Sequence, residues 1–278
     1  MLVFEKVNEL RSFLDAERSA GKSIGFVPTM GALHEGHGSL ISQARKENDI
    51  VIASVFVNPR QFNNPDDLLK YPRTTESDIQ LLTELHCDVL FLPSVEEIYA
   101  QDYIPPVLDL GILDTVMEGA LRPGHFNGVV QVVYRLFDLI HPTRAYFGLK
   151  DFQQVAVINY MVKTLKIGVE IVACPIMRDN KGLALSSRNM RLSGLQKEEA
   201  LLISRTLFDA AEYAKEHTPF ETKEHALDFF SKGRMNLEYF EIVDPVTLES
   251  IDEWVPGAIA CIVAYAGDVR LIDNYPMK

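Results

Sequence analysis

The chain has 278 residues, 47% of them hydrophobic, enough for one large core or for a main domain with a smaller one. Its 39 acidic residues outnumber the 27 basic ones, and the net charge of -12 argues against nucleic acid as a partner. Three isolated cysteines in apolar stretches favour reduced thiols, and no uncharged run approaches the ~20 apolar residues of a membrane span. We therefore expect a soluble, cytoplasmic protein without a membrane partner.

The first part of the chain alternates between predicted helices and short strands. An amphipathic N-terminal helix comes first, and strands are expected at residues 24–27, 50–57, 89–92, 145–148 and 169–173, with helical patterns between them. The run IVIASVFV is rich in β-branched residues and lacks polar alternation, which is typical of a central parallel strand. This alternation predicts a doubly wound parallel α/β sheet, in which ligands bind beyond the carboxyl ends of the strands.

The pattern changes after about Cys174. A long charged helical stretch over residues 196–232 precedes three strand-like segments, LEYFEIV, AIACIVAY and VRLIDN. These elements predict a second, smaller α+β C-terminal domain. We place the first domain at residues 1–174 and the second at residues 175–278.

The motif PTMGALHEGH follows the predicted strand at 24–27 and opens an amphipathic helix. A helix N-terminus offers unpaired N–H groups and a positive dipole end, which suit a phosphate. His34 and His37 can donate hydrogen bonds to phosphoryl oxygens, and Gly36 lets a ligand approach the backbone. Loop histidines are also common as surface residues or metal ligands, but no third ligand occurs nearby at metal spacing.

A second motif, RDNKGLALSSRN, lies far downstream. Its Ser186, Ser187 and Arg188 follow Gly182, which allows an unusual backbone turn. Hydroxyl donors beside a fixed cation suit the phosphates that leave as pyrophosphate. Since Ser-Ser-Arg is also a common surface tripeptide or helix cap, this interpretation depends on partnership with the first motif.

Other predicted strands are also followed by polar side chains. The segment YFGLKDFQQ supplies Lys150, which can neutralise phosphate, and Asp151, which can hold magnesium or the ribose hydroxyls. The segment after residue 57 supplies Asn58, Gln61 and Tyr71. For each of these residues taken individually, an ordinary turn residue or helix cap is the favoured interpretation. Together with the two motifs, they indicate an adenylylation that activates a carboxylate.

A strand followed by H-x-G-H at a helix start, with a late Ser-Ser-Arg loop, resembles the superfamily of nucleotidylyltransferases and class I aminoacyl-tRNA synthetases. The blocks PTMGALHEGH, FVNPRQF, YPRT, RPGHFNG, GLKDFQQ and GLALSSRN, in this order, resemble the pantoate:β-alanine ligase family. This resemblance implies an ATP-dependent ligase that condenses pantoate with β-alanine to pantothenate. The reaction would pass through a pantoyl-adenylate and release AMP and pyrophosphate.

The resemblance also implies a Rossmann-like N-terminal domain, a C-terminal lid, a homodimer and Mg2+ bound with ATP, without assigning metal ligands. It assigns catalytic roles to His37, His34, Lys150, Ser186, Ser187 and Arg188. The implied ATP site comprises Met30, Gly31, Ala32, Leu33, His34, Glu35, Gly36, His37, Gly148, Leu149, Lys150, Asp151, Met177, Leu185, Ser186, Ser187 and Arg188. Gln61 and Gln154 would hold pantoate, with Gln61 also close to β-alanine.

Two positions depart from the family pattern. Gly38 stands where a bulkier apolar residue is usual, and Leu149 where an acidic residue is common. Glycine is expected to loosen the start of the helix, because it carries a higher backbone entropy cost. The direction of Arg122 and His125 stays open, since glycine and proline surround them.

Three other functions are compatible with parts of the pattern. A nucleotidylyltransferase would need more cations in its acceptor pocket than Gln61 and Gln154 provide. An aminoacyl-tRNA synthetase is disfavoured by the short length, the acidic charge and the lack of a basic RNA-binding domain. A module that senses ATP without turnover would be supported by loss of the histidines or of the Ser-Ser-Arg loop, and both are present.

Overall fold

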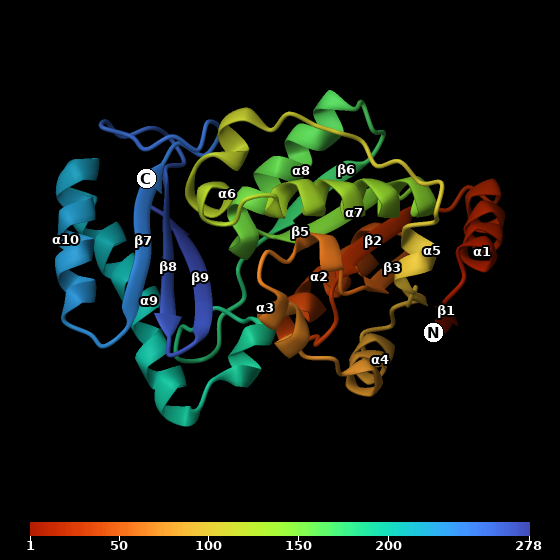
Figure 1. The fold of residues 1–278 in the computed structure, drawn as a ribbon, viewed down its shortest axis with the longest axis horizontal. Coiled ribbons are helices and arrows are strands. Elements are labelled where there is room, and N and C mark those ends of the chain that lie inside the picture. Colours follow the sequence, from red (N-terminus) through yellow and green to blue (C-terminus); the bar gives the residue numbers. More distant parts are fainter. The chain divides into compact units, whose positions relative to one another are not determined.

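The computed structural model describes residues 1–278 and comprises two compact units (Figure 1). Unit 1 consists of Met1–Leu110, Arg122–Leu149 and Gln154–Pro175, and unit 2 of Gly111–Leu121, Lys150–Gln153 and Ile176–Lys278. Two short segments of unit 2 are therefore inserted within the sequence of unit 1. The domain boundary that we placed between residues 174 and 175 remains a prediction.

Unit 1 is built on a six-stranded sheet in the order β1-β4-β3-β2-β5-β6, with all neighbouring strands parallel. The strands are β1 (Leu2–Phe4), β2 (Ile24–Thr29), β3 (Ile50–Val55), β4 (Val89–Phe91), β5 (Arg144–Gly148) and β6 (Glu170–Cys174). The predicted doubly wound parallel sheet is confirmed, and all of β3 is buried, as its apolar run indicates. The strand order reverses between β2 and β5, the position at which such sheets bind ligands.

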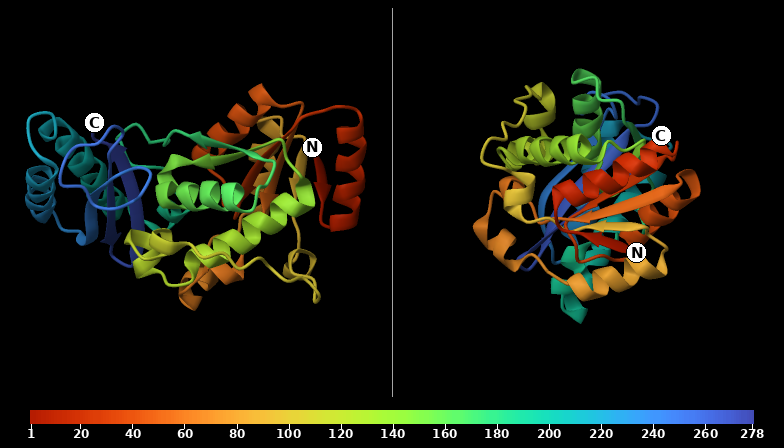
Figure 2. Two further views of the ribbon diagram at one scale, coloured as in Figure 1. Left: turned by 90° about the horizontal axis from the view of Figure 1, so that it is seen from above. Right: turned by 90° about the vertical axis from the view of Figure 1, so that its right-hand side faces the viewer.

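Helices cover both faces of this sheet. The helices of unit 1 are α1 (Val7–Ser19), α2 (Glu35–Glu47), α3 (Pro65–Lys70), α4 (Thr75–Glu84), α5 (Val95–Ile98), α7 (His125–Ile140) and most of α8 (Phe152–Thr164), with the 3-10 turn η1 (Pro59–Gln61). One face packs on α2 and α4 around Val27 and Leu40. On the other face Phe26 meets Phe137 of α7 edge to face, and Figure 2 shows α1 beside α7 on this side. No helix combines the length and apolar character needed to cross a membrane.

Unit 2 contains a three-stranded antiparallel sheet in the order β7-β8-β9, which confirms the predicted smaller α+β domain. Its strands are β7 (Asn236–Val243), β8 (Ile259–Ala266) and β9 (Val269–Pro276), and its helical elements are η2 (Gly111–Asp114), α6 (Met117–Leu121), η4 (Ser187–Arg191), α9 (Gly194–Tyr213) and α10 (Pro219–Ser231). The predicted helical stretch at 196–232 is interrupted, because Thr218 caps α10 through Glu221 and Pro219 occupies its first turn.

Buried polar contacts join the inserted segments to the rest of unit 2. Arg270 on β9 donates to both carboxylate oxygens of Glu118, at 2.7 and 2.8 Å. Gln153 accepts from the Glu118 backbone N–H at 3.0 Å and donates to the carbonyl of Leu113, also at 3.0 Å. Glu118 is buried, and a bidentate guanidinium partner of this kind satisfies its charge. The segments Gly111–Leu121 and Lys150–Gln153 are thereby fixed to one strand.

Gly128 lets α7 lie directly against η1 in unit 1. A Cβ at this position would stand 2.3 Å from the carbonyl oxygen of Arg60 and 2.7 Å from Cα of Gln61. Non-bonded atoms do not approach this closely. Any larger residue at position 128 must therefore shift the backbone of α7 or of η1. Gly128 thus sets the position of the turn that carries Gln61.

We expect Gly128→Ala to lower the free energy of unfolding by up to about 2 kcal/mol in a urea titration. Overpacking costs about 1–3 kcal/mol, which outweighs the roughly 1 kcal/mol that alanine gains over glycine inside a helix. Gly168→Ala is the matched control, because a Cβ there meets no atom within 4 Å. Equal stability of the two variants would contradict the close approach of α7 and η1.

Candidate active site

The loop after β2 turns sharply before α2 begins. Gly31 has a φ of 81° and Ala32 a φ of 50°, both in the left-handed region. A Cβ on Gly31 would stand 3.0 Å from both Asp78 Oδ2 and Val55 Cγ1, so packing as well as backbone conformation requires glycine. The Gly31 N–H donates to Thr29 Oγ1 at 3.1 Å. The first motif is therefore a tightly closed strand-to-helix turn.

Asp78 on α4 holds this turn in place. Its carboxylate accepts hydrogen bonds from the backbone N–H groups of Ala32 at 3.0 Å and Leu33 at 2.8 Å, and from the Thr74 hydroxyl at 3.0 Å. Asp78 is only 2% exposed, and a carboxylate so far from water has to be matched by donors. The sequence analysis missed Asp78, because its backbone partners lie 45 and 46 residues away.

His34 and His37 lie side by side where α2 begins, with ring centroids 4.2 Å apart. Nδ1 of His34 accepts from the Gly36 N–H at 3.1 Å, and Nδ1 of His37 accepts from the His34 N–H at 3.4 Å. A ring nitrogen that accepts carries no proton, so the neutral ring carries its proton on Nε2. Each histidine therefore presents an Nε2–H donor, the group that a phosphoryl oxygen needs.

Glycine at position 38 leaves the helix start intact. α2 begins at Glu35, and the Gly38 N–H donates to the carbonyl of His34 at 3.0 Å, which closes the first turn. A Cβ at Gly38 would approach Leu85 Cδ1 to 3.2 Å. The helix therefore begins with a closed first turn at this departure from the family pattern, and the expected loosening stays a prediction.

Gly148 and Leu149 leave the sheet at the same edge as the first motif. Gly148 ends β5, which pairs in parallel with β2, and Leu149 is the next residue. The carboxyl ends of parallel neighbours meet at one edge, so these backbone positions belong to the edge at which ligands bind. Lys150 and Asp151 continue the segment within unit 2.

Gln61 reaches the first motif from η1. Its Nε2 donates to Met30 Sδ at 3.0 Å, and its Oε1 accepts from Asn58 Nδ2 at 3.1 Å. The structure thus brings the residue predicted to hold the carboxylic acid beside the loop predicted to hold ATP. Gln154, the second predicted acid ligand, is partly buried in the first turn of α8.

His125 and Arg122 support the backbone of Gln61. Nδ1 of His125 lies 2.8 Å from the Gln61 carbonyl oxygen, which can only accept, so this nitrogen carries the proton. Nε2 of the same ring lies 3.0 Å from Nη1 of Arg122, which can only donate. The orientation of Arg122 and His125, which the sequence left open, is therefore toward Gln61. Tyr71 is buried and packs edge to face on Phe62.

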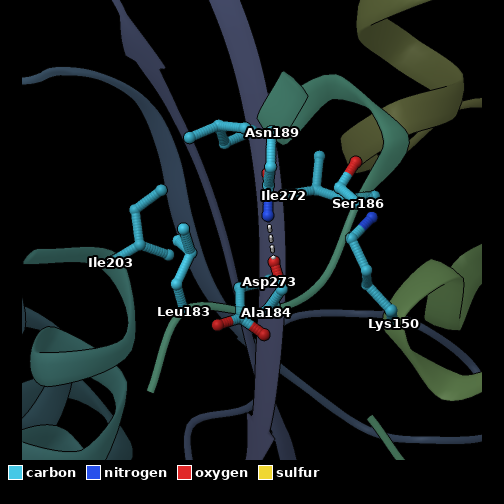
Figure 3. Close-up of a pocket in the computed structure, with 9 residues that line it drawn as sticks. Lys150, Leu183, Ala184, Ser186, Asn189, Ile203, Ile272 and Asp273 are labelled. Carbon is cyan, nitrogen blue, oxygen red and sulfur yellow. Dashed lines mark hydrogen bonds between the residues drawn. The ribbon is translucent and has the colours of Figure 1, made fainter. Parts of the chain in front are cut away.

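Unit 2 contains a pocket between the Ser-Ser-Arg loop and β9 (Figure 3). Its lining residues are Lys150, Leu183, Ala184, Ser186, Asn189, Ile203, Leu271, Ile272 and Asp273. Figure 3 shows Lys150 and Ser186 on the same side of the pocket. The amine and the hydroxyl that the sequence analysis connects with phosphate therefore belong to residues of one pocket.

Two consecutive residues of β9 hold the elements that carry these groups. Asn274 Nδ2 donates to the Lys150 carbonyl at 3.0 Å. Asp273 accepts from both terminal nitrogens of Arg178, at 2.5 and 2.9 Å. Burial raises the pKa of Asp273, whereas its contact with Arg178 acts in the opposite direction. Among the residues that line this pocket, Lys150 is the only basic one.

A hairpin positions the Ser-Ser-Arg loop. The Leu185 N–H donates to the Met177 carbonyl at 2.9 Å, and Gly182 at the turn has a φ of 103°, as its place in the motif predicts. Asp179 Oδ1 accepts from the N–H groups of Lys181 and Leu183, at 2.9 Å each. The backbones of Met177 and Leu185 are therefore adjacent. Both side chains are apolar.

Ser186 caps the short helix η4. Its Oγ accepts from the Arg188 N–H at 3.3 Å, so the helix-cap interpretation of this residue is also correct. A hydroxyl that accepts one hydrogen bond can still donate its own proton, which keeps Ser186 available to an anion. Ser187 is buried, with 6% of its surface exposed.

Comparisons with known proteins agree on one family. The family model described as pantoate-beta-alanine ligase matches residues 2–276. Pantothenate synthetase from Phocaeicola vulgatus is 52% identical over 288 residues and covers all of both chains. The corresponding protein from Bacteroides fragilis is 48% identical over 287 residues, covering 100% of this chain and 99% of its own.

Solved structures give the same result. Pantothenate synthetase from Thermus thermophilus is 43% identical, with a TM-score of 0.95 over 100% of this chain and 99% of its own. Pantoate-beta-alanine ligase from Francisella tularensis, complexed with beta-gamma ATP and beta-alanine, is 37% identical, with a TM-score of 0.84 over 100% of this chain and 98% of its own. The chain belongs to the pantoate-beta-alanine ligase family.

Proposed function

We propose that this chain uses ATP to join pantoate to β-alanine, forming pantothenate through a pantoyl-adenylate, and that it releases AMP and pyrophosphate. Membership of the family supports the reaction, and the Francisella tularensis relative is complexed with beta-gamma ATP and beta-alanine. The observation that carries the assignment within this chain is the contact of Gln61 Nε2 with Met30 Sδ at 3.0 Å. It joins an acid-binding amide to an ATP-binding loop.

In the first step, a carboxylate oxygen of pantoate attacks the α-phosphorus of ATP, and the bond to the β-phosphate oxygen breaks. His37, assisted by His34, donates from Nε2 to the α-phosphoryl oxygens as their charge rises. The backbone from Met30 to His37, with Gly148 and Leu149, holds the nucleotide. In unit 2, Lys150, Ser186, Ser187 and Arg188 take up the charge of the departing pyrophosphate, and Met177 and Leu185 contact the nucleotide.

In the second step, the amine of β-alanine attacks the acyl carbon of the adenylate. The new C–N bond forms as the bond to the AMP oxygen breaks, and the nitrogen releases its proton to the solvent. Gln61 and Gln154 hold the pantoyl group through both steps, and Gln61 also lies close to the amine. Positioning accounts for most of the rate in this scheme, because no covalent bond to the enzyme is needed.

Magnesium is proposed to enter with ATP. The structure contains no cluster of three or more His, Cys, Asp or Glu side chains able to hold a metal ion. Asp151 offers one carboxylate, 48% exposed and 3.9 Å from the Lys150 amine. Magnesium commonly combines one or two carboxylates with substrate phosphates and water, so Asp151 fits the role of its protein ligand. When bound, the ion would neutralise charge on the phosphates.

Two further features are part of the proposal because the family resemblance implies them. The chain is expected to form a homodimer and to act in the cytoplasm. Residues 175–278 are expected to act as a lid over residues 1–174.

Exchange of labelled pyrophosphate into ATP tests the proposed reaction at its first step. We expect exchange that needs pantoate and magnesium but not β-alanine, and that His37→Ala slows by about 10²-fold, as expected for the loss of one preorganised donor. The control is His86→Asn, since His86 is exposed and asparagine tolerates its φ of 54°. Exchange without pantoate would refute the reaction, and an unchanged rate in His37→Ala would refute the role of His37.

Gln61→Glu tests the proposed contact with pantoate. Glutamate keeps the oxygen that accepts from Asn58 but replaces the donor with a negative oxygen that repels a carboxylate. We expect the KM for pantoate to rise by about 10-fold or more, which corresponds to about 1.4 kcal/mol, with the KM for ATP little changed. Gln131→Glu adds the same charge to unit 1 on α7 and is the control. Equal pantoate KM values for the two variants would remove Gln61 from the substrate site.

A further inference from the structure

A chain of hydrogen bonds in unit 1 begins at Tyr99 and ends at Gln61. The Tyr99 hydroxyl donates to Asn58 Oδ1 at 2.9 Å. Asn58 Nδ2 then donates to Gln61 Oε1 at 3.1 Å. Asn58 is only 1% exposed, so its amide has no water to replace a missing partner. Tyr99 follows α5, and neither sequence motif includes it.

Backbone partners fix the orientation of the Asn58 amide. Oδ1 also accepts from the Arg60 N–H at 3.2 Å, and a backbone N–H can only donate. Nδ2 also donates to the Gly128 carbonyl at 3.1 Å, and a carbonyl can only accept. Exchanging the oxygen and nitrogen of Asn58 would therefore create two repulsive contacts. The amide has one permitted orientation.

The fixed Asn58 amide determines which end of Gln61 is presented to a ligand. Because Asn58 Nδ2 needs an acceptor, it holds the Gln61 oxygen, and the Gln61 nitrogen points to Met30 Sδ at 3.0 Å. Thioether sulfur is a weak acceptor, so a carboxylate oxygen would be a stronger partner for the same N–H groups. Gln61 is thereby oriented as a donor to an anion.

The ring of Tyr99 is held on two sides. Cζ of the Arg60 guanidinium stands 3.8 Å from the ring centroid, and Phe56 packs edge to face with centroids 6.2 Å apart. Burial raises the pKa of the Tyr99 hydroxyl, while the charge of Arg60 acts against this shift. The hydroxyl consequently stays protonated at neutral pH and remains a donor to Asn58.

We propose that Tyr99 is a positioning residue that makes the acid site select a carboxylate, acting through Asn58 and Gln61. The inference rests on the proposed role of Gln61 in binding pantoate. The Tyr99 hydroxyl supplies one of the two donors to Asn58 Oδ1, so it strengthens the single permitted orientation of the amide pair. Its loss leaves the ring contacts in place and weakens only the orientation.

The test compares Tyr99→Phe with Tyr103→Phe in the full-length protein. Both substitutions remove one phenol hydroxyl from a partly buried ring, and the two rings lie 6.3 Å apart. The Tyr103 hydroxyl is buried without a hydrogen-bond partner, so its removal breaks no such bond. The measurements are kcat, the KM for each substrate, the melting temperature, and the inhibition constant of the neutral amide analogue of pantoate.

We expect Tyr99→Phe to raise the KM for pantoate by about 3- to 10-fold, the range for one lost hydrogen bond, with the KM for ATP unchanged. The neutral amide should bind about as well as before, so the preference for the carboxylate falls. Tyr103→Phe should match the wild type in kcat, in every KM and in the inhibition constant, and its melting temperature should not fall.

Two results would overturn the role of Tyr99. One is a pantoate KM in Tyr99→Phe that matches that in Tyr103→Phe. The other is a uniform change in kcat and in all KM values together with a lower melting temperature, since a merely structural residue behaves in this way.

Gln61→Glu separates this inference from the proposed function. If Gln61→Glu raises the pantoate KM and Tyr99→Phe does not, the inference fails while the proposed function stands. If Gln61→Glu has no effect on that KM, the proposed role of Gln61 fails first. The double variant should also show a smaller Tyr99→Phe effect than the single one, because the two residues act through one contact.

Discussion

The buried carboxylate of Asp78 is the constraint on which the first half of the site depends. It accepts hydrogen bonds from the N–H groups of Ala32 and Leu33 and so fixes the backbone between β2 and α2. The start of α2 is then determined, and so are the positions of His34 and His37 on its first turn. An isolated carboxylate at 2% exposure would be strongly unfavourable, and the loop N–H groups are the donors that satisfy it. The loop and the carboxylate therefore stabilise each other.

Fixed hydrogen-bond partners also determine which atoms of the site are donors. The δ nitrogens of His34 and His37 accept from backbone N–H groups, which leaves each ε nitrogen as a donor. The oxygen of Gln61 is held by Asn58, which leaves its nitrogen as a donor. Unit 2 by itself carries an amine and a hydroxyl, those of Lys150 and Ser186, in one pocket. A protein with a net charge of -12 can in this way present local partners for ATP and a carboxylate.

Local sequence patterns were sufficient for five of the six strands of the parallel sheet and for the motif positions. The runs before residues 29, 55 and 148 are strands because buried parallel strands need continuous apolar sequence, and the polar loops follow them. Asp78, Tyr99 and Asn274 could not be assigned in this way, because each acts through a partner distant in sequence. Strand β1 escaped prediction because three residues carry no periodic pattern.

Product analysis with all three substrates tests the account most directly. Purified protein would be incubated with ATP, magnesium and pantoate, with and without β-alanine, and AMP, pyrophosphate and the amide would be quantified. The account predicts sustained turnover only when both pantoate and β-alanine are present, with the three products formed in equal amounts. Pantoate-independent release of pyrophosphate, or transfer of AMP to a phosphate acceptor in place of amide formation, would contradict it.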